Sequence, residues 1–313
     1  MKSRYISLCI ICAATMASSL LAQPSEQDIA REREERAAMP DTTGSGPYAA
    51  MKQSAPMLID HVIYRPADVT AMGNTKLGLY VFGNGGCTDD AASSRMHLLE
   101  VASHGYLVIA PGRIYSGPDA VERDNPDETG LDGTRPEQLA QAIDWALSEN
   151  VRQGSPFFNR IDPEAIAISG YSCGGVQALL NAGDQRADTM VIMNSGLFVD
   201  GNTSMAGMET NKEILQNIHT PILYVLGGPS DIAYTNGMDD FAKIDQVPVA
   251  VANIDVGHGG TYWDANGGKA AQVVVNWLNW QLRGDHAAGQ MFLGEACGLC
   301  SDPNWSFEKK RLD

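Results

Sequence analysis

The sequence predicts an α/β protein with a mostly parallel central sheet and helices on both faces. From residue 58 onward, short apolar runs alternate with longer amphipathic segments, which is typical of parallel strands joined by crossover helices. Most runs are continuously apolar rather than alternating, as expected when helices cover both faces of a sheet. The predicted strands are Leu58–Tyr64, Leu77–Phe82, Tyr106–Ala110, Ala165–Ser169, Thr189–Met193, Ile222–Leu226 and Val249–Ile254.

Two of the predicted helices have clear signals in the sequence. Thr134 and Glu137 have the spacing of a capping box, and apolar residues with helical spacing follow them. Near the end of the chain, Trp277 belongs to a second apolar stripe with helical spacing. Such a stripe buries a helix more often than it binds a ligand, so we expect Trp277 to be a core residue. The stripe consists of Ala270, Val273, Val274, Trp277, Leu278 and Leu282.

The 313 residues suffice for one large domain, which we expect over residues 58–290. Residues 1–22 contain two basic residues and then an apolar stretch, which predicts a cleaved secretory signal peptide and a secreted or periplasmic protein. A membrane anchor is the alternative, but the apolar run is short and is diluted by polar residues. Residues 23–57 carry a charged run followed by Pro, Gly, Ser and Thr, which predicts an N-terminal arm or linker. Residues 291–313 are predicted to be an irregular tail.

The charge of the chain excludes some classes of partner. The net charge is −16 at pH 7, and removal of the two basic residues of the signal peptide makes the mature chain more acidic still. A surface this acidic argues against nucleic acid or an anionic membrane as a partner, because both are themselves negatively charged. The acidity does not identify a substrate.

Ser172 lies in a glycine-rich segment between a predicted strand and a predicted helix. The segment reads Gly170-Tyr171-Ser172-Cys173-Gly174-Gly175. A strand that leads directly into a helix needs a sharp turn, and glycines allow close backbone approach there. Such a turn exposes the serine hydroxyl at the carboxyl end of the sheet, so Ser172 is the predicted nucleophile. The alternative is a purely structural glycine-rich turn.

A serine hydroxyl needs a base to take its proton, and the base needs a carboxylate to orient it. His258 follows the last predicted strand of the domain, and Asp231 follows the strand before it. We therefore predict Asp231 as the acid and His258 as the base. Asp239, Asp240 and Asp255 are alternatives for the acid, but they lie further from the strand end or too close to His258 along the chain.

With these residues in place, the chain resembles the α/β-hydrolase superfamily over about Leu58 to Asp285. The resemblance is closest to cap-less dienelactone-hydrolase-like and chlorophyllase-like serine esterases. Three segments carry it: Phe82 to Cys87 (FGNGGC), Ser103 to Ala110 (SHGYLVIA) and the segment around Ser172. Dienelactone hydrolases proper have cysteine in place of Ser172, so their substrate is not implied. The resemblance implies ester hydrolysis through an acyl-enzyme, with no metal and no organic cofactor.

In this fold, two backbone N–H groups form the oxyanion hole. One donor is expected from the glycine-rich loop that ends at Cys87, and the other is the N–H of Cys173. The sequence does not distinguish between Gly85, Gly86 and Cys87 as the first donor. A simple tight turn is the alternative interpretation of this loop.

Four cysteines remain after the signal peptide, and exported proteins usually oxidise such an even set. Cys87 and Cys173 belong to loops that converge on the expected oxyanion hole, so we predict a disulfide between them. Cys297 and Cys300 would then form a local disulfide in the tail. A redox role for this second pair would need a strand-to-helix context, and a zinc site would need more ligands than the sequence offers nearby.

The expected cleft is open, because the segment between Met193 and Pro221 is too short for a folded cap. An open cleft admits small-molecule esters and also bulky, polymer-attached ones, such as extracellular plant cell-wall esters. Tyr171, Tyr262 and Trp263 could line the substrate pocket or could equally be packing residues. Arg113 could hold a substrate carboxylate, although a surface salt bridge is the simpler interpretation.

Three functions are compatible with the sequence. A carboxylic ester hydrolase is the expected one. A peptidase or amidase of the same fold is the second, although such enzymes normally carry an additional propeller or cap domain. A catalytically silent binding protein is the third, and the presence of all three expected catalytic residues argues against it.

Overall fold

The computed structural model describes residues 31, 34–125, 130–131, 133–199 and 203–312. The predicted signal peptide, residues 1–22, lies outside the described residues. Residues 36–313 form one structural unit, separate from the first 35 residues, and the description below concerns this unit. Among the described helices, none combines the length and the apolar character needed to cross a membrane.

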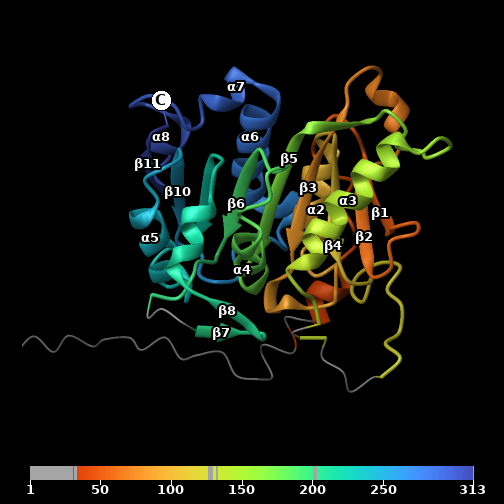
Figure 1. The fold of residues 1–313 in the computed structure, drawn as a ribbon, viewed down its shortest axis with the longest axis horizontal. Helices are drawn as coiled ribbons and strands as arrows, with labels where there is room; N and C mark the ends of the chain where they lie inside the picture. Colours follow the sequence, from red (N-terminus) through yellow and green to blue (C-terminus); the bar gives the residue numbers. More distant parts are fainter. Residues whose placement is uncertain (1–30, 32–33, 126–129, 132, 200–202, 313) are drawn as a thin grey trace, which may run out of the picture. The chain divides into compact units, whose positions relative to one another are not determined.

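The unit is built on a nine-stranded, mostly parallel sheet with the order β1-β2-β4-β3-β5-β6-β9-β10-β11 (Figure 1). The strands are β1 (Ala50–Ser54), β2 (His61–Pro66), β3 (Leu77–Gly83), β4 (Tyr106–Pro111), β5 (Ile161–Tyr171), β6 (Thr189–Met193), β9 (Ile222–Leu226), β10 (Val249–Ile254) and β11 (Trp305–Lys310). The six central strands pair in parallel in the order β4-β3-β5-β6-β9-β10. The strands β1, β2 and β11 pair antiparallel at the two edges. The prediction of a mostly parallel sheet is confirmed.

Helices cover both faces of this sheet, as the continuous apolar strands predict. One face packs against α3 (Glu137–Val151), α4 (Cys173–Leu180) and α5 (Tyr234–Lys243), and the other packs against α2 (Arg95–Ser103) and α6 (Gly268–Arg283). Every residue of β3, β4, β6, β9 and β10 is buried, because each of these strands lies between two helical layers. Because the central strands run parallel, their carboxyl ends all lie at one edge of the sheet, where the loops that follow them meet.

The sheet extends beyond the predicted domain of residues 58–290 at both ends. The predicted arm of residues 23–57 contains β1, and the predicted irregular tail of residues 291–313 contains β11. Both are edge strands, exposed on one side. Their sequences lack the continuous apolar runs of the central strands, so the sequence did not predict them as strands.

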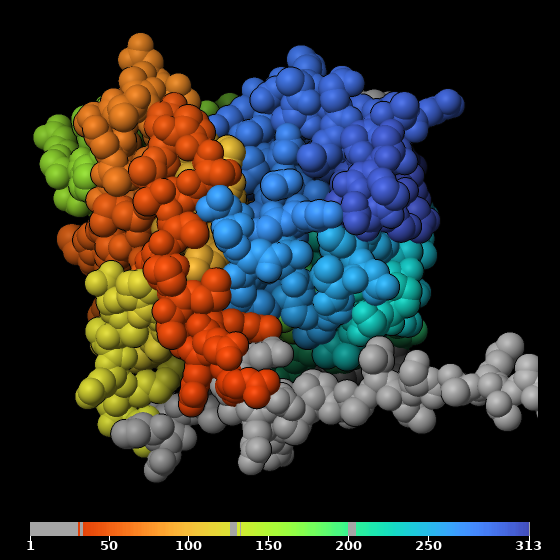
Figure 2. All heavy atoms as spheres, turned by 180° about the vertical axis from the view of Figure 1, so that it is seen from behind, coloured from red at the N-terminus to blue at the C-terminus, as the bar shows by residue number. Residues whose placement is uncertain are grey.

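The part of the arm that precedes β1 packs against the helical layer instead of extending into solvent. Arg95 of α2 donates hydrogen bonds to the carbonyls of Arg36 (2.8 Å) and Met39 (2.6 Å), and it pairs with Asp41 at 3.0 Å. Lys52 of β1 pairs with the same Asp41. Figure 2 shows the red-orange N-terminal segment running along the face of the molecule that is seen from behind. Two charged residues of the predicted arm, Asp41 and Lys52, therefore take part in largely buried ion pairs.

The predicted capping box of Thr134 and Glu137 at the start of α3 is wrong. The Thr134 hydroxyl does not cap the helix; it donates to the carbonyl of Cys87 at 2.9 Å, and α3 begins only at Glu137. Tertiary contact with a neighbouring loop has overridden the local capping signal. The prediction for Trp277 is confirmed, because its ring is fully buried in α6 and its Nε1 donates to Thr189 at 2.8 Å.

Candidate active site

Ser172 lies at the carboxyl end of β5, in the turn that leads directly into α4. Its backbone has φ 52° and ψ −121°, a conformation that a non-glycine residue rarely adopts. Hydrogen bonds at both of its backbone groups hold it there. The Ser172 N–H donates to Met193 O (3.0 Å), and the Ser172 carbonyl accepts from Gly175 N (2.9 Å) and from the Ser195 hydroxyl (2.7 Å). Strain of this kind persists only where the surroundings impose it, and it is most common at functional sites.

Glycines make this turn possible because no side chain fits beside it. A Cβ on Gly174 would lie 2.0 Å from the carbonyl of Gly83 at the end of β3. A Cβ on Gly170 would lie 2.1 Å from the carbonyl of Gly174. The glycine pattern in the sequence thus reflects direct backbone contact between two strand ends and the first turn of α4.

The structure brings Ser172, His258 and Asp231 together from three separate strand ends. The Ser172 Oγ lies 2.9 Å from His258 Nε2, and His258 Nδ1 lies 2.6 Å from Asp231 Oδ1. A carboxylate only accepts hydrogen bonds, so Nδ1 carries a proton and Nε2 of the neutral ring is left as an acceptor for the serine hydroxyl. This arrangement can remove a proton from Ser172 and return it to a leaving group.

Asp231 is buried and fully supplied with hydrogen-bond donors. Burial alone would raise its pKa, but donation from His258 and from the backbone N–H groups of Ala233 (2.9 Å) and Gly227 (3.0 Å) outweighs that effect and lowers the pKa below its usual value. Asp231 therefore stays ionised at neutral pH and can stabilise an imidazolium on His258.

The three alternative candidates for the acid bond to residues other than His258. Asp239 and Asp240 both pair with Lys212, at 2.8 and 2.5 Å, and Asp255 accepts a hydrogen bond from Ser230. Of the candidates considered from the sequence, the structure brings only Asp231 to His258.

The glycine-rich loop after β3 forms a short 3-10 turn, η2 (Gly85–Cys87), next to the start of α4. The Cys87 N–H already donates to the carbonyl of Asn84 at 3.1 Å within this turn, which argues against its expected role as an oxyanion donor. Gly86 has φ 62°, which a residue without Cβ adopts freely, and together with Cys173 N–H it remains a candidate donor. Asn84 fixes the loop by donating to the carbonyls of Thr88 (2.8 Å) and Pro111 (2.7 Å).

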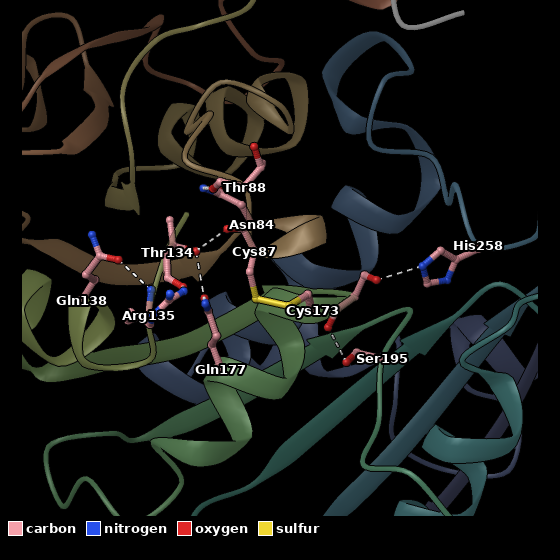
Figure 3. Close-up of a disulfide and its surroundings, with 11 residues drawn as sticks. Asn84, Cys87, Thr88, Thr134, Arg135, Gln138, Cys173, Gln177, Ser195 and His258 are labelled. Atoms are coloured by element: carbon pink, nitrogen blue, oxygen red, sulfur yellow. Dashed lines mark hydrogen bonds between the residues drawn. A yellow bond between two sulfur atoms is a disulfide. The ribbon is translucent and has the colours of Figure 1, made fainter. Parts of the chain in front are cut away.

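Cys87 and Cys173 form a disulfide, as predicted from the convergence of their loops. Figure 3 shows this bond joining the η2 loop to the first residue of α4, next to the serine that faces His258. Thr134 supports the loop by donating its N–H and its hydroxyl to the carbonyl of Cys87, and Gln177 donates to that hydroxyl at 3.1 Å. The two segments beside Ser172 are thus covalently and non-covalently fixed to each other.

The second predicted pair, Cys297 and Cys300, also lies at disulfide distance. It encloses the start of α8 (Gly298–Ser301), a short helix that packs against β11. Cys297 is buried and Cys300 is exposed. This disulfide therefore closes a local turn in the C-terminal segment.

The aromatic residues expected in the pocket form a packed cluster under the site. Tyr262 is 0% exposed, so its interpretation as a pocket-lining residue is wrong. Tyr171 and Trp263 are half-buried: the Tyr171 hydroxyl donates to His258 O at 2.9 Å, and the Trp263 Nε1 donates to Ser93 O at 2.9 Å. The ring of Tyr171 lies 4.5 Å from that of Tyr262, centroid to centroid. Tyr262 is therefore a packing residue, and the rings of Tyr171 and Trp263 pack against it.

Arg113 lies at the carboxyl end of β4, where it pairs with Asp60 at 3.3 Å. Its side chain is 51% exposed, which agrees with the simpler interpretation of a surface salt bridge. It lines a cavity of about 370 Å³ together with Asp89, Tyr115 and Gln138. None of Ser172, Asp231 or His258 lines this cavity, so the role of Arg113 beside the nucleophile is not supported.

One residue of the site was not anticipated from the sequence. Asn194 follows β6 directly, and its side-chain amide donates to Asp231 Oδ2 at 2.8 Å. The available signal was its position, because a polar residue after a buried parallel strand lies at the edge where functional loops meet.

The comparisons with known proteins add no family to this picture. No protein-family model matches the chain, and the search of curated proteins returns no match. The functional interpretation therefore depends on the geometry of the Ser172, His258 and Asp231 hydrogen bonds and of the loops that hold them.

Proposed function

We propose that this protein is a serine hydrolase of the α/β-hydrolase fold that cleaves carboxylic esters. The observation that carries the proposal is the continuous hydrogen-bond relay from Ser172 Oγ through His258 to Asp231, with distances of 2.9 and 2.6 Å. The serine occupies a strained strand-to-helix turn at the carboxyl edge of a mostly parallel sheet, which is the location of the nucleophile in this fold.

The proposed reaction has two halves. His258 Nε2 takes the proton from Ser172 as its oxygen attacks the ester carbonyl carbon. The tetrahedral intermediate then expels the alcohol, which receives that proton, and leaves an acyl group on Ser172. Water repeats the sequence, with His258 again as base, and releases the carboxylic acid.

The charge that develops on the carbonyl oxygen needs donors that are already in place. The N–H groups of Cys173 and Gly86 are the proposed oxyanion donors, and the disulfide beside them supports this role by fixing η2 to α4. Loss of a single oxyanion donor typically costs about a hundredfold to a thousandfold in rate. A rigid connection between the two donor segments therefore has a direct catalytic benefit.

The proposed substrate class is inferred from the segment between β6 and β9. Between β6 and β9, the described chain forms a small hairpin, β7 (Thr203–Met205) and β8 (Met208–Thr210), and the 3-10 turn η3 (Lys212–Asn217). No cap domain is present among these described residues, which supports an open cleft and esters attached to bulky or polymeric groups. The cysteine pairs at disulfide distance support an oxidising, extracytoplasmic environment.

The test uses a fluorophosphonate probe, which reacts with activated serines, on the mature wild-type protein and on two variants of it. The wild type should be labelled and should hydrolyse short-acyl nitrophenyl esters, whereas Ser172→Ala should lose both properties. Ser148→Ala, in α3, is the control and should behave as wild type, because Ser148 donates only within its own helix to Trp145 O.

Two outcomes would change the proposal. Labelling that persists in Ser172→Ala, or absence of any labelling, would exclude Ser172 as the nucleophile and with it the hydrolase function. Faster turnover of aminoacyl anilides than of matched esters would identify an amidase or peptidase instead. Release of acid from an acylated polysaccharide, dependent on Ser172, tests the polymer-attached class of substrate.

A further inference from the structure

Asn194 has an unusual backbone for a residue with a side chain. It follows β6 with φ 42°, is 2% exposed, and donates its N–H to Val225 O at 2.7 Å. Asparagine tolerates this left-handed conformation better than most residues, but glycine would adopt it at lower cost. The presence of a side chain here therefore points to a role for the amide group itself.

The amide of Asn194 has a single orientation that satisfies its neighbours. Its NH₂ group faces Asp231 Oδ2 at 2.8 Å and Gly257 O at 3.2 Å, both of which can only accept. Its Oδ1 accepts a hydrogen bond from the Tyr262 hydroxyl. The orientation is thus fixed from both ends.

The two carboxylate oxygens of Asp231 have different tasks. Oδ1 accepts from His258 Nδ1 and from Ala233 N, whereas Oδ2 accepts from Asn194 and from Gly227 N. Rotation of the carboxylate away from His258 would break the bonds on Oδ2. Asn194 therefore opposes that rotation, and its bond to the carbonyl of Gly257 also connects it to the loop that carries His258.

Tyr262 completes this connection from the other side. Its ring is fully buried, 4.5 Å from Tyr171 and 5.9 Å from the buried His97 ring, measured between centroids. Tyr262 lies four residues after His258 in the same segment. Its hydroxyl, which donates to Asn194 Oδ1, therefore connects the Asn194 amide to the loop that carries His258.

We propose that Asn194 is a positioning residue that holds the Asp231 carboxylate in line with His258, and that the Tyr262 hydroxyl fixes the Asn194 amide for this task. The inference rests on the proposed hydrolase function. Neither residue touches the substrate in this mechanism, and each acts only through Asp231.

The test compares Asn194→Gly, Tyr262→Phe and a matched control in ester hydrolysis. Glycine suits the left-handed backbone and removes the side chain that carries the amide, so loss of activity cannot come from backbone strain. Phenylalanine keeps the buried ring of Tyr262 and removes only its hydroxyl. The control is Tyr106→Phe, which removes a hydroxyl bonded at 2.9 Å to another asparagine, Asn279 of α6.

A hydrogen bond to a charged group is worth more than one between neutral groups. We expect kcat of Asn194→Gly to fall about tenfold to a hundredfold, with KM changed by less than about twofold. We expect Tyr262→Phe to lower kcat about fivefold. The hydrogen bond that is lost joins two neutral groups, and it affects Asp231 only through Asn194. Tyr106→Phe should keep wild-type kcat.

A merely structural role is distinguished by repeating Asn194→Gly in an Asp231→Ala background. A residue that acts through Asp231 causes no further loss of kcat there, whereas a structural residue causes the same loss as in the wild type. Wild-type kcat in Asn194→Gly, or an additive loss in the double variant, would overturn the inference while leaving the Ser172-dependent activity intact. A wild type without Ser172-dependent turnover would overturn the hydrolase function, and this inference with it.

Discussion

The disulfide between Cys87 and Cys173 allows a quantitative test, because the chain contains a matched control. It closes a loop with a sequence separation of 86, whereas Cys297–Cys300 closes one of only 3. The perturbation is replacement of each pair by alanine. In the chain-entropy model, the long loop contributes about 4.6 kcal/mol to the free energy of unfolding at 25 °C and the short loop about 1.6 kcal/mol.

The assay is equilibrium denaturation in urea of the wild type and of the two double-alanine variants. The expected difference between the variants, about 3 kcal/mol, depends only on the ratio of the two loop lengths and is therefore better determined than either absolute value. Residual structure in the unfolded chain would reduce both losses together. Equal losses in the two variants would refute the reasoning, as would greater stability of the variant that lacks Cys87 and Cys173.

The same variants separate stability from catalysis. Both should be assayed in buffer, where each remains folded, with a short-acyl ester as substrate. The variant without Cys87 and Cys173 should lose kcat by less than the roughly thousandfold upper cost of a complete oxyanion donor, because the donor groups remain but are less rigidly held. The variant without Cys297 and Cys300 should keep wild-type kcat, since that pair lies in the segment around α8.

Two further predictions concern stability. Burial raises the pKa of Asp240 from 3.8 to about 6, against the opposing effect of Lys212, so the folded state binds a proton more tightly than the unfolded state does. Wild-type stability should therefore fall, relative to Asp240→Asn, by about 2 kcal/mol as pH rises from 4 to 7, and a pH-independent difference in urea unfolding would contradict this. In α4, Gly174→Ala should lower the free energy of unfolding by about 3 kcal/mol, because its Cβ would meet the carbonyl of Gly83. The control, Gly183→Ala, has no neighbour closer than 3.9 Å and should change stability by less than about 0.5 kcal/mol; similar losses in both variants would argue against the backbone contact.

The sequence by itself predicted those parts of the molecule that have strong local signals. Seven strands could be found because a strand buried on both faces needs a continuous apolar run, and these are β2, β3, β4, β5, β6, β9 and β10. Ser172, Asp231 and His258 could be found because each follows such a run, and parallel strands end at the same edge of the sheet. These inferences need only the order of residues along the chain and the glycines that a sharp strand-to-helix turn requires.

Other features were decided by contacts between distant segments. Thr134 has the sequence signature of a helix cap, yet its hydroxyl bonds to Cys87, 47 positions away. Tyr262 follows His258 closely in the chain, but its ring points into the core and its hydroxyl reaches Asn194, 68 positions away. Local patterns carry no information about such partners.

Contacts between distant segments also decided the two edge strands of the sheet and the residue that supports Asp231. β1 and β11 are exposed on one side, so their burial depends on which strand lies beside them and not on a continuous apolar run. Asn194 gains its place beside Asp231 only because β6 and β9 are neighbours in the sheet. The sequence determined which residues stand at the strand ends, and the tertiary structure decided which of them face each other, because hydrogen bonds depend on distance in space and not on separation along the chain.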